Sequence, residues 1–390
     1  MWPEADLRIH RVDFDADFDF DFDLDTVAGY RAGYNSGILT LPIPAKPDMT
    51  DKFEQLVEIA QAMVAPGKGI LAIDESAGTI QKRFDSVGIA STEENRRDYR
   101  SMMLSTPGLG QFISGAILFD ETIRQSTADG TRLVDLMEQA GILPGIKVDK
   151  GAKALAGFEG EKVTEGLDGL RERLAEYVEL GAKFAKWRAV ITIGDDIPSR
   201  ACIDANAHAL ARYAALCQEA GIVPIVEPEV LMDGDHDLDT SFDVTEATLK
   251  SLFQQLYEQN VMLEGTVLKA SMVISGSGAS DRAGVDDVAE ATVDCLLNAV
   301  PASTAGVVFL SGGQGDLEAT RHLDAMNKMG DMPWPLSFSY GRALQAECLK
   351  TWAADPKANH EKAQQILLHR ARMNGAATVG EWDEDEERAG

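Results

Sequence analysis

The sequence has few of the residues that build disulfide frameworks or metal centres. Its 390 residues include four cysteines and six histidines. The cysteines, Cys202, Cys217, Cys295 and Cys348, form no CxxC pair and show no regular spacing, so we expect reduced thiols in a cytoplasmic protein. The histidines form no HxH or HExxH motif and no cluster with cysteine. The sequence therefore predicts neither a metal site nor a bound cofactor.

Long apolar runs and excess basic residues are also missing. No run of about 18 apolar residues is present, which excludes a transmembrane helix. The N-terminal residues are rich in aspartate, unlike the apolar core of a signal peptide or an Arg-rich transit peptide. Acids outnumber bases so strongly that the net charge is −28. Such a field repels nucleic acid and anionic membranes, so any phosphate site must be locally basic.

Residues 1–48 differ in composition from the rest of the chain. Between Asp13 and Asp23 aspartate alternates with phenylalanine or alanine, which would place like charges along one face of a strand. We expect a low-complexity, disordered extension. A misplaced start codon would explain it, because Met49 opens an amphipathic helical pattern. The alternative is an interaction arm.

From Gly69 onward, short apolar runs alternate with amphipathic helical patterns. Runs of this kind predict buried parallel strands. The predicted strands are Gly69–Asp74, Gly115–Asp120, Gly145–Asp149, Phe184–Val190, Val223–Glu227, Gly265–Lys269, Val307–Ser311 and Leu336–Ser339. The predicted helices include Thr92–Leu104, Gly166–Leu180, Ala201–Ala220, Val244–Gln259, Val285–Ala299, Leu317–Met329 and Asp355–Ala376.

Eight strand-then-helix units predict an α/β protein of the (β/α)8 barrel class. We expect one barrel domain over residues 49–376, followed by an acidic tail over residues 377–390. In such barrels the active site lies at the C-terminal ends of the strands. The polar residues at those ends are Asp74, Lys147, Asp149, Lys186, Arg188, Glu227, Glu229, Lys269, Ser311 and Arg342. Burying a lysine costs several kcal/mol unless it is paired, so three lysines here need partners or a function.

Lys269 ends a predicted strand with no turn signal before it. Partial burial and the neighbouring lysines Lys147 and Lys186 would favour its neutral amine, which can attack a ketone. The alternative is a lysine that extends its ammonium out of the barrel mouth into solvent. The pattern alone leaves both interpretations open.

Two carboxylates, Glu227 and Glu229, lie on one face of an extended segment. Such a pair suits stepwise proton transfer, because neighbouring carboxylates titrate at different pH values. Alternatively, the two residues neutralise the nearby lysines, and the same contacts can serve both purposes.

Glycine-rich sequence follows the seventh predicted strand as Ser311-Gly312-Gly313, and Gly341-Arg342 follows the eighth. This is the usual phosphate-binding position of barrels. Glycine lets backbone N–H groups approach a phosphate, and arginine offers a bidentate fork. A Ser-Gly-Gly sequence by itself also fits a plain turn, but the arginine on the adjacent unit favours phosphate binding.

Together these residues lie in segments that resemble the class I fructose-bisphosphate aldolases. The matching segments are Gly67–Ser76, Thr92–Tyr99, Ile113–Thr122, Gly145–Gly151, Phe184–Arg188, Ile225–Val230, Leu268–Val273, Phe309–Gln314 and Phe338–Gln345. They follow the order of the family over Met49–Trp382. The resemblance implies a metal-independent lyase of glycolysis and gluconeogenesis, cytoplasmic and homotetrameric. Its reaction would be the reversible cleavage of fructose 1,6-bisphosphate to dihydroxyacetone phosphate and glyceraldehyde 3-phosphate.

The resemblance also implies a role for each site residue. Lys269 matches the Schiff-base lysine, and Glu227 matches the acid/base that dehydrates the carbinolamine. Asp74 matches the carboxylate that helps form the imine and break the C3–C4 bond, while Glu229 and Lys186 support Glu227. The implied substrate contacts are Lys147 and Arg188; Ser311, Gly312, Gly313, Ser339 and Arg342 for the phosphate at the ketone end; and Ser76, Thr79, Arg83 and Arg96 near the other phosphate. The iminium withdraws electrons, so no Lewis-acid metal is needed.

Two features depart from the pattern of the animal aldolases. Those proteins end in a tyrosine that enters the active site, whereas Tyr340 is the last tyrosine here. Protonation of the enamine must then use another group, or product release is slower. Ala270 and Ser271 stand where Pro-Asn is usual, which leaves the loop geometry and the preference among ketose phosphates open.

Two other functions remain as alternatives. One is a transaldolase-like Schiff-base barrel acting on another sugar phosphate, although two phosphate regions favour a bisphosphate. The other is a non-catalytic scaffold, since aldolases bind partners such as actin. Retention of Lys269, Glu227 and Asp74 together favours an active enzyme.

Removal of residues 1–48 should leave folding and catalysis unchanged, because the alternating aspartates oppose burial of the phenylalanines between them. A chain that starts at Met49 is expected to keep the melting temperature and kcat of the full-length protein within error. Protection of Phe14–Phe22 in limited proteolysis, with a lower melting temperature after truncation, would instead indicate an interaction arm.

Overall fold

The computed structural model describes residues 49–389 of the chain. The predicted disordered extension, residues 1–48, lies outside this range. Among the described residues, no helix combines the length and apolar character needed to cross a membrane. All four cysteines are unpaired, in line with the expected reduced thiols, and all four are buried.

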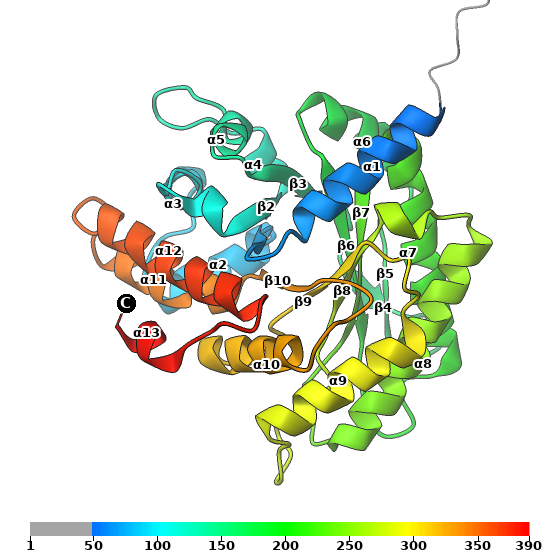
Figure 1. The fold of residues 1–390 in the computed structure, drawn as a ribbon. Coiled ribbons are helices and arrows are strands. Elements are labelled where there is room, and N and C mark those ends of the chain that lie inside the picture. Colours follow the sequence, from blue (N-terminus) through cyan, green and yellow to red (C-terminus); the bar gives the residue numbers. More distant parts are fainter. Residues whose placement is uncertain (1–48, 390) are drawn as a thin grey trace, which may run out of the picture. The chain divides into compact units, whose positions relative to one another are not determined.

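Eight parallel strands form a closed barrel, and helices surround it (Figure 1). The strands are β1 (Gly69–Ile73), β2 (Ile113–Leu118), β3 (Leu143–Lys147), β6 (Phe184–Ile191), β7 (Val223–Val230), β8 (Val267–Ala270), β9 (Gly306–Phe309) and β10 (Leu336–Tyr340). Pairing of β1 with both β2 and β10 closes the barrel. Each predicted apolar run overlaps one of these strands, which confirms the (β/α)8 prediction. A short antiparallel hairpin, β4 (Ala152–Ala154) and β5 (Lys162–Thr164), was not predicted.

The helices lie between and after these strands. They are α1 (Met49–Met63), α2 (Ala77–Ser86), α3 (Glu93–Leu104), α4 (Asp120–Ile123), α5 (Leu133–Gln139), α6 (Leu170–Glu179), α7 (Arg200–Ala220), α8 (Leu238–Glu258), α9 (Val285–Ala299), α10 (Asp316–Lys328), α11 (Arg342–Ala354), α12 (His360–Ala377) and α13 (Glu384–Arg388), with short 3-10 turns η1 (Leu109–Gln111) and η2 (Leu263–Gly265). The N-cap of α3 is Thr92, whose hydroxyl accepts from the Asn95 amide at 3.1 Å. Gly221 ends α7 in the left-handed conformation (φ 81°), which suits glycine.

The C-terminal region differs from its predicted boundaries. The last long helix, α12, begins at His360 rather than near Asp355, because the Asp355 carboxylate caps a turn by accepting from the amides of Lys357 and Ala358. Within the predicted acidic tail, α13 forms a further short helix.

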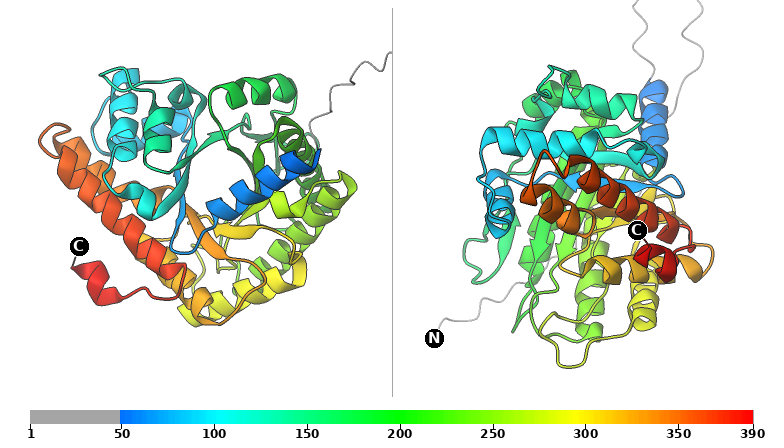
Figure 2. Two further views of the ribbon diagram at one scale, coloured as in Figure 1. Left: turned by 45° about the horizontal axis from the view of Figure 1, so that its top comes forward. Right: turned by 90° about the vertical axis from the view of Figure 1, so that its left-hand side faces the viewer.

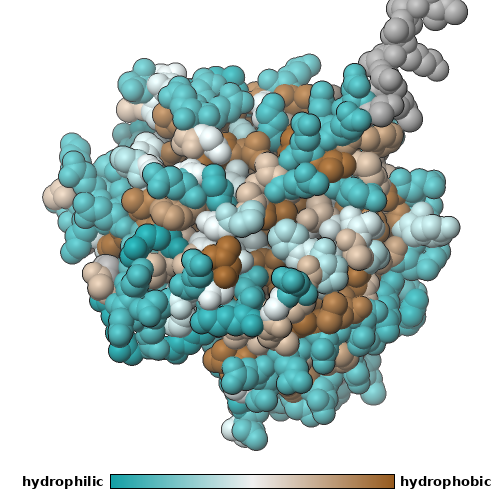
Figure 3. Space-filling model, in the orientation of Figure 1, coloured by the Kyte–Doolittle hydropathy of each residue, from teal (hydrophilic) through white to brown (hydrophobic). Residues whose placement is uncertain are grey.

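Hydrophilic residues cover most of the face shown in Figure 3.

One end of the barrel is closed by α1, shown in blue in Figure 2. Apolar side chains of this helix, including Leu56 and Met63, are buried in one cluster with the barrel residues Ile225 and Val308. Ser114 on β2 adds a hydrogen bond from its hydroxyl to the Met63 carbonyl at 2.6 Å. This end is therefore packed with side chains, which leaves the opposite end, at the C-terminal ends of the strands, for the site.

Glycines in the strands make room for a large ring inside this packed region. Phe184 at the start of β6 is fully buried. A Cβ atom at Gly145 would lie 2.2 Å from the Phe184 ring, and one at Gly115 would lie 2.9 Å from it. The glycines in the predicted runs therefore reflect close packing inside the barrel.

The substitution Gly145→Ala should lower the free energy of unfolding by about 1–3 kcal/mol, because the added methyl overpacks the Phe184 ring. Urea denaturation followed by circular dichroism measures this change. Gly78→Ala on α2 is the matched control, since no atom lies within 4 Å of its Cβ position. Equal stability of the two variants would show that the ring moves aside without cost.

Candidate active site

A cavity of about 1000 Å³ lies at the C-terminal ends of the barrel strands. The predicted site residues that line it are Asp74, Ser76, Thr79, Arg83, Lys147, Lys186, Arg188, Glu227, Glu229, Lys269, Ser311, Gly312, Ser339 and Arg342. The pairing of neighbouring strands aligns Lys147 with Lys186 and Arg188 with Glu227. Because partners in a parallel sheet point to the same side, residues distant in sequence meet at one place.

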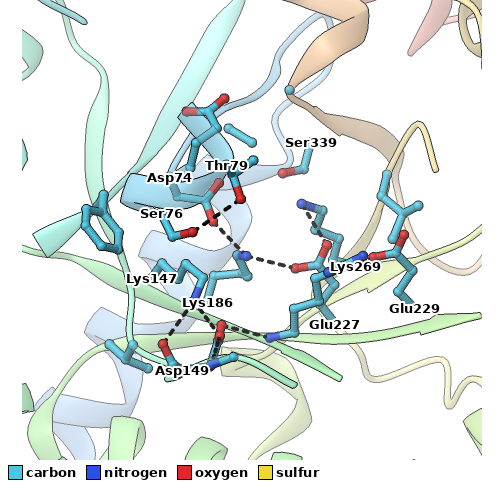
Figure 4. Close-up of a pocket in the computed structure, with 18 of the residues that line it drawn as sticks. Asp74, Ser76, Thr79, Lys147, Asp149, Lys186, Glu227, Glu229, Lys269 and Ser339 are labelled. Atoms are coloured by element: carbon cyan, nitrogen blue, oxygen red, sulfur yellow. Dashed lines mark hydrogen bonds and ion pairs between the residues drawn. The ribbon is translucent and has the colours of Figure 1, made fainter. Parts of the chain in front are cut away.

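The centre of the cavity is a chain of alternating charges (Figure 4). The Lys186 Nζ lies 2.7 Å from Asp74 Oδ2 and 3.2 Å from Glu227 Oε2. On its other side, Glu227 Oε1 lies 3.0 Å from the Lys269 Nζ. Both lysines are about 4% exposed. Each buried charge therefore has a partner of the opposite sign, which offsets the cost of desolvation.

These contacts decide the protonation states of three residues. Burial lowers the pKa of Lys186, but attraction to Asp74 and Glu227 outweighs it and raises the pKa well above its usual value. Burial raises the pKa of Asp74, but the Lys186 and Lys269 ammoniums lower it to about 2. The pKa of Glu227 is also lowered, because the nearby cations outweigh burial. At neutral pH Lys186 is therefore a cation, and both carboxyl groups are ionised.

The environment of Lys269 differs from the sequence-based expectation of a lysine crowded by two cations. Lys147 forms its own ion pair with Asp149, and its Nζ also donates to the Asp149 carbonyl at 2.9 Å. Lys186 forms ion pairs with Asp74 and Glu227. Glu227 neutralises both lysines, and its Oε1 lies at hydrogen-bond distance from the Lys269 amine, so the acid/base role stays a prediction.

Glu229 has a different partner from Glu227. Its Oε2 accepts from the Arg188 Nε in an ion pair, and this pair lies on adjacent strands. Alternate residues of β7 therefore serve two purposes, because Glu227 meets the lysines while Glu229 orients an arginine at the cavity wall.

The side of the cavity near β9 and β10 carries polar groups suited to an anion. Ser311, Gly312 and Arg342 line it, and the buried Ser339 hydroxyl makes no hydrogen bond within residues 49–389. Gly312 (φ 58°) is left-handed, as is the residue that follows it. Gly313 does not line the cavity, but a Cβ there would lie 3.7 Å from Arg342 Nη2. Its contribution is therefore to the shape of the turn.

Ser76, Thr79 and Arg83 line the cavity after β1, the strand that pairs with β10. The two hydroxyls lie 3.2 Å apart, and Arg83 forms an ion pair with Glu75. Arg96, which the resemblance placed near this phosphate, does not line the cavity.

The reason is the local pairing of Arg96 on α3. Its Nε and Nη2 bind the two oxygens of Glu121 at 2.9 and 2.5 Å, and its Nη1 donates to the Ser91 carbonyl at 2.6 Å. These bonds hold its guanidinium away from the cavity. The expectation of a substrate contact at Arg96 is therefore corrected.

Some residues of the site received no role from the sequence. Asp149 is buried, pairs with Lys147 and accepts from the Gly151 amide at 3.0 Å. Arg173 on α6 donates to the carbonyls of Val148 and Gly166 at 2.8 and 2.5 Å, which fixes the loop after β3. Asp149 ended a predicted strand, and this position alone could have indicated that it belongs to the site. Arg173 had none, because it lies on a helix distant from any motif.

Comparison with known proteins places the chain in a family. A family model described as "Fructose-bisphosphate aldolase class-I" matches residues 55–390. The chain belongs to the class I fructose-bisphosphate aldolases. The family resemblance of the sequence segments is thus confirmed.

Individual relatives of this aldolase family agree over nearly their whole length. The chain is 67% identical to "Probable fructose-bisphosphate aldolase class 1" of Xanthomonas campestris pv. campestris, covering 84% of this chain and 98% of that protein. It is 51% identical to "Fructose-bisphosphate aldolase 4, cytosolic" of Arabidopsis thaliana, covering 85% and 84%. A solved structure of the Plasmodium falciparum aldolase, in complex with TRAP and a small-molecule inhibitor, matches with a TM-score of 0.84 at 47% identity, covering 85% of this chain and 96% of that one.

The substitution Lys186→Met should destabilise this aldolase by about 3–5 kcal/mol at pH 7, because Asp74 and Glu227 lose the buried cation between them. The pH dependence should also reverse. In the parent protein the depressed pKa of Asp74 stabilises the fold above its unfolded pKa of about 4, and this stability is lost as pH falls toward 2. In the variant, protonation of Asp74, which has lost its ion-pair partner, should instead raise stability between pH 7 and 5.

Thermal unfolding at several pH values measures this reversal. Lys250→Met is the control, because Lys250 forms an exposed pair with Glu246 at 3.0 Å on the surface of α8. Parallel stability profiles for Lys186→Met and the parent protein would contradict the assigned charge states.

Proposed function

We propose that the chain cleaves fructose 1,6-bisphosphate reversibly to dihydroxyacetone phosphate and glyceraldehyde 3-phosphate through a Schiff base at Lys269. One observation carries the proposal. The Lys269 Nζ lies 3.0 Å from a buried carboxylate of Glu227, inside a cavity whose lining also includes Arg83, Arg188 and Arg342.

The pairing of Lys269 with Glu227 supplies the first proton transfer. A lysine must lose a proton before its amine attacks a ketone, and the carboxylate beside it accepts that proton. After this transfer Glu227 is protonated. It can then donate the proton to the carbinolamine hydroxyl, which leaves as water. Glu227 and Lys269 thus exchange one proton, which links attack by the amine to dehydration.

Asp74 is placed to act at the next bond. Asp74 is ionised at neutral pH, so a carboxylate oxygen is available to accept the proton of the C4 hydroxyl as the C3–C4 bond breaks. The electrons of that bond flow into the iminium and give an enamine, while the aldehyde leaves. Protonation of the enamine at C3 and attack of water at C2 then release the ketose phosphate and restore the amine. Lys186 stays cationic and holds Asp74 and Glu227 as bases.

Two anion-binding walls favour a bisphosphate substrate over that of a transaldolase-like enzyme. We assign the phosphate at the ketone end to Ser311, Gly312, Ser339 and Arg342, and the other phosphate to Ser76, Thr79 and Arg83. We assign Lys147 and Arg188, which also line the cavity, as further substrate contacts. Arginine and serine donors suit phosphate oxygens, and the left-handed Gly312 lets backbone amides approach.

We further propose a cytoplasmic homotetramer, as the family resemblance implies and as the cytosolic Arabidopsis relative suggests. Light scattering after size exclusion measures the oligomeric state.

A partner-binding role is the second candidate function, because the Plasmodium relative was solved in complex with TRAP. The complete set of lysine and carboxylate groups in the cavity favours catalysis.

Lys269→Met should abolish cleavage and keep the fold, since methionine fills similar volume without the amine. Borohydride reduction with dihydroxyacetone phosphate, followed by peptide mass spectrometry, should label Lys269 in the parent protein and nothing in the variant. Lys153→Met, at an exposed hairpin position, is the control and should be labelled like the parent. Activity of Lys269→Met within tenfold of the parent would exclude the nucleophile assignment. Absence of both label and cleavage in the parent would favour the scaffold.

A further inference from the structure

The acidic C-terminal segment is anchored to the barrel helices through one buried carboxylate. Glu387 on α13 is about 6% exposed and forms an ion pair with Arg370 on α12. Trp382 Nε1 donates to the second carboxylate oxygen of Glu387 at 2.9 Å. His369 Nε2 lies 3.0 Å from the Glu387 carbonyl. In Figure 1 α13, in red, lies beside α10 and α12.

A second set of contacts fixes the chain that leads into α13. The Trp382 amide donates to Asp324 Oδ1 at 3.0 Å, and Arg321 pairs with Glu384 at 2.7 Å. The Arg321 guanidinium also lies 5.9 Å from the centre of the Trp382 ring. Glu387 is therefore held at a defined position against α10 and α12.

The partner of Glu387 joins two helices that begin at the candidate phosphate wall. Arg370 Nη2 donates to the Asp316 carbonyl at 3.1 Å and to the Thr320 hydroxyl at 2.8 Å, both in the first turns of α10. Arg370 Nε donates to the Ala343 carbonyl at 3.4 Å, in the first turn of α11. One guanidinium thus connects the starts of α10 and α11, and Arg370 itself does not line the cavity.

Both connected helix starts belong to the ketone-end phosphate site assigned above. The turn Ser311–Gly313 leads directly into α10, which starts at Asp316. Arg342 is itself the first residue of α11. Helix N-termini present free N–H groups to anions, so the relative position of these two helices sets where the phosphate is bound.

Arg370 depends on Glu387 to keep this geometry. Arg370 is 8% exposed, and within residues 49–389 Glu387 is the only carboxylate that forms an ion pair with it. A buried guanidinium without a counter-charge is unfavourable, and it would leave its present position to reach water. Loss of Glu387 would therefore release the bonds that join the first turns of α10 and α11.

We infer that Glu387 and Arg370 are positioning residues for the ketone-end phosphate, so that the C-terminal helix is part of the substrate site although neither residue lines the cavity. This inference rests on the proposed function. The Lys269–Glu227 pair and the wall at Ser76 lie outside the Arg370 contacts. A defect at Glu387 should thus affect one substrate and not the other.

The test is kinetic analysis of Glu387→Gln in the direction of condensation. We expect the KM for dihydroxyacetone phosphate to rise about five- to tenfold, the effect of losing one charge-assisted contact. The KM for glyceraldehyde 3-phosphate and kcat should stay within about twofold, because displacement of one phosphate wall weakens binding at that wall only. The dissociation constant of inorganic phosphate, measured by calorimetry, should rise in parallel. Glu387→Asp should recover part of the loss.

Glu386→Gln is the matched control. It removes the same charge from the same helix, but Glu386 is exposed and its partner Arg372 lies 3.4 Å away on the surface. It should behave like the parent protein. Arg370→Lys should resemble Glu387→Gln, since an ammonium cannot reach all four partners of the guanidinium.

Three outcomes would decide whether Glu387 positions the ketone-end phosphate site. An unchanged KM for dihydroxyacetone phosphate in Glu387→Gln would overturn the inference. Equal rises in both KM values with a lower kcat would also overturn it, since they indicate general loosening of the fold. If the parent protein catalyses no aldol reaction but Glu387→Gln still weakens binding of inorganic phosphate, the proposed function fails while the positioning role stands.

Discussion

The structure of the site depends on a buried line of alternating charges, Asp74–Lys186–Glu227–Lys269, in which each cation contacts a carboxylate within about 3.2 Å. No member of this line is stable alone in an apolar barrel mouth. The line therefore requires that β1, β6, β7 and β8 keep their register, because a slip of one residue would turn each side chain to the other face of the sheet. Packing elsewhere in the barrel serves this requirement.

Two kinds of packing maintain that register. At the closed end, α1 covers the barrel, and glycines such as Gly145 admit the Phe184 ring between strands. At the open end, polar contacts replace apolar ones, and Arg173 fixes the loop after β3 through backbone carbonyls. Rigid packing at one end thus supports a charged, accessible cavity at the other. The acidic chain, of net charge −28, thus keeps lysines and arginines at the cavity, many of them paired with a carboxylate.

Residues behind the cavity complete the arrangement. Asp149 forms an ion pair with Lys147, and Glu229 forms one with Arg188. Each of these cationic side chains is therefore held in a defined orientation before any substrate is bound. Arg370 extends the same principle to the starts of α10 and α11. Under the proposed function, preorganised donors of this kind lower the cost of orienting a flexible sugar bisphosphate.

The sequence by itself determined the barrel and most of the site, because apolar runs that end in charged residues report directly on strands whose ends share one cavity. It also singled out Lys269 as a candidate nucleophile and Glu227 as a candidate acid/base. It misplaced Arg96, and it gave no role to Arg173 or Arg370. Only tertiary structure decided where these three arginine side chains lie. The position of an arginine side chain on a helix depends on which carboxylate or carbonyl another element brings within hydrogen-bond distance. Local patterns specify elements, whereas partners distant in sequence specify where a long charged side chain is held.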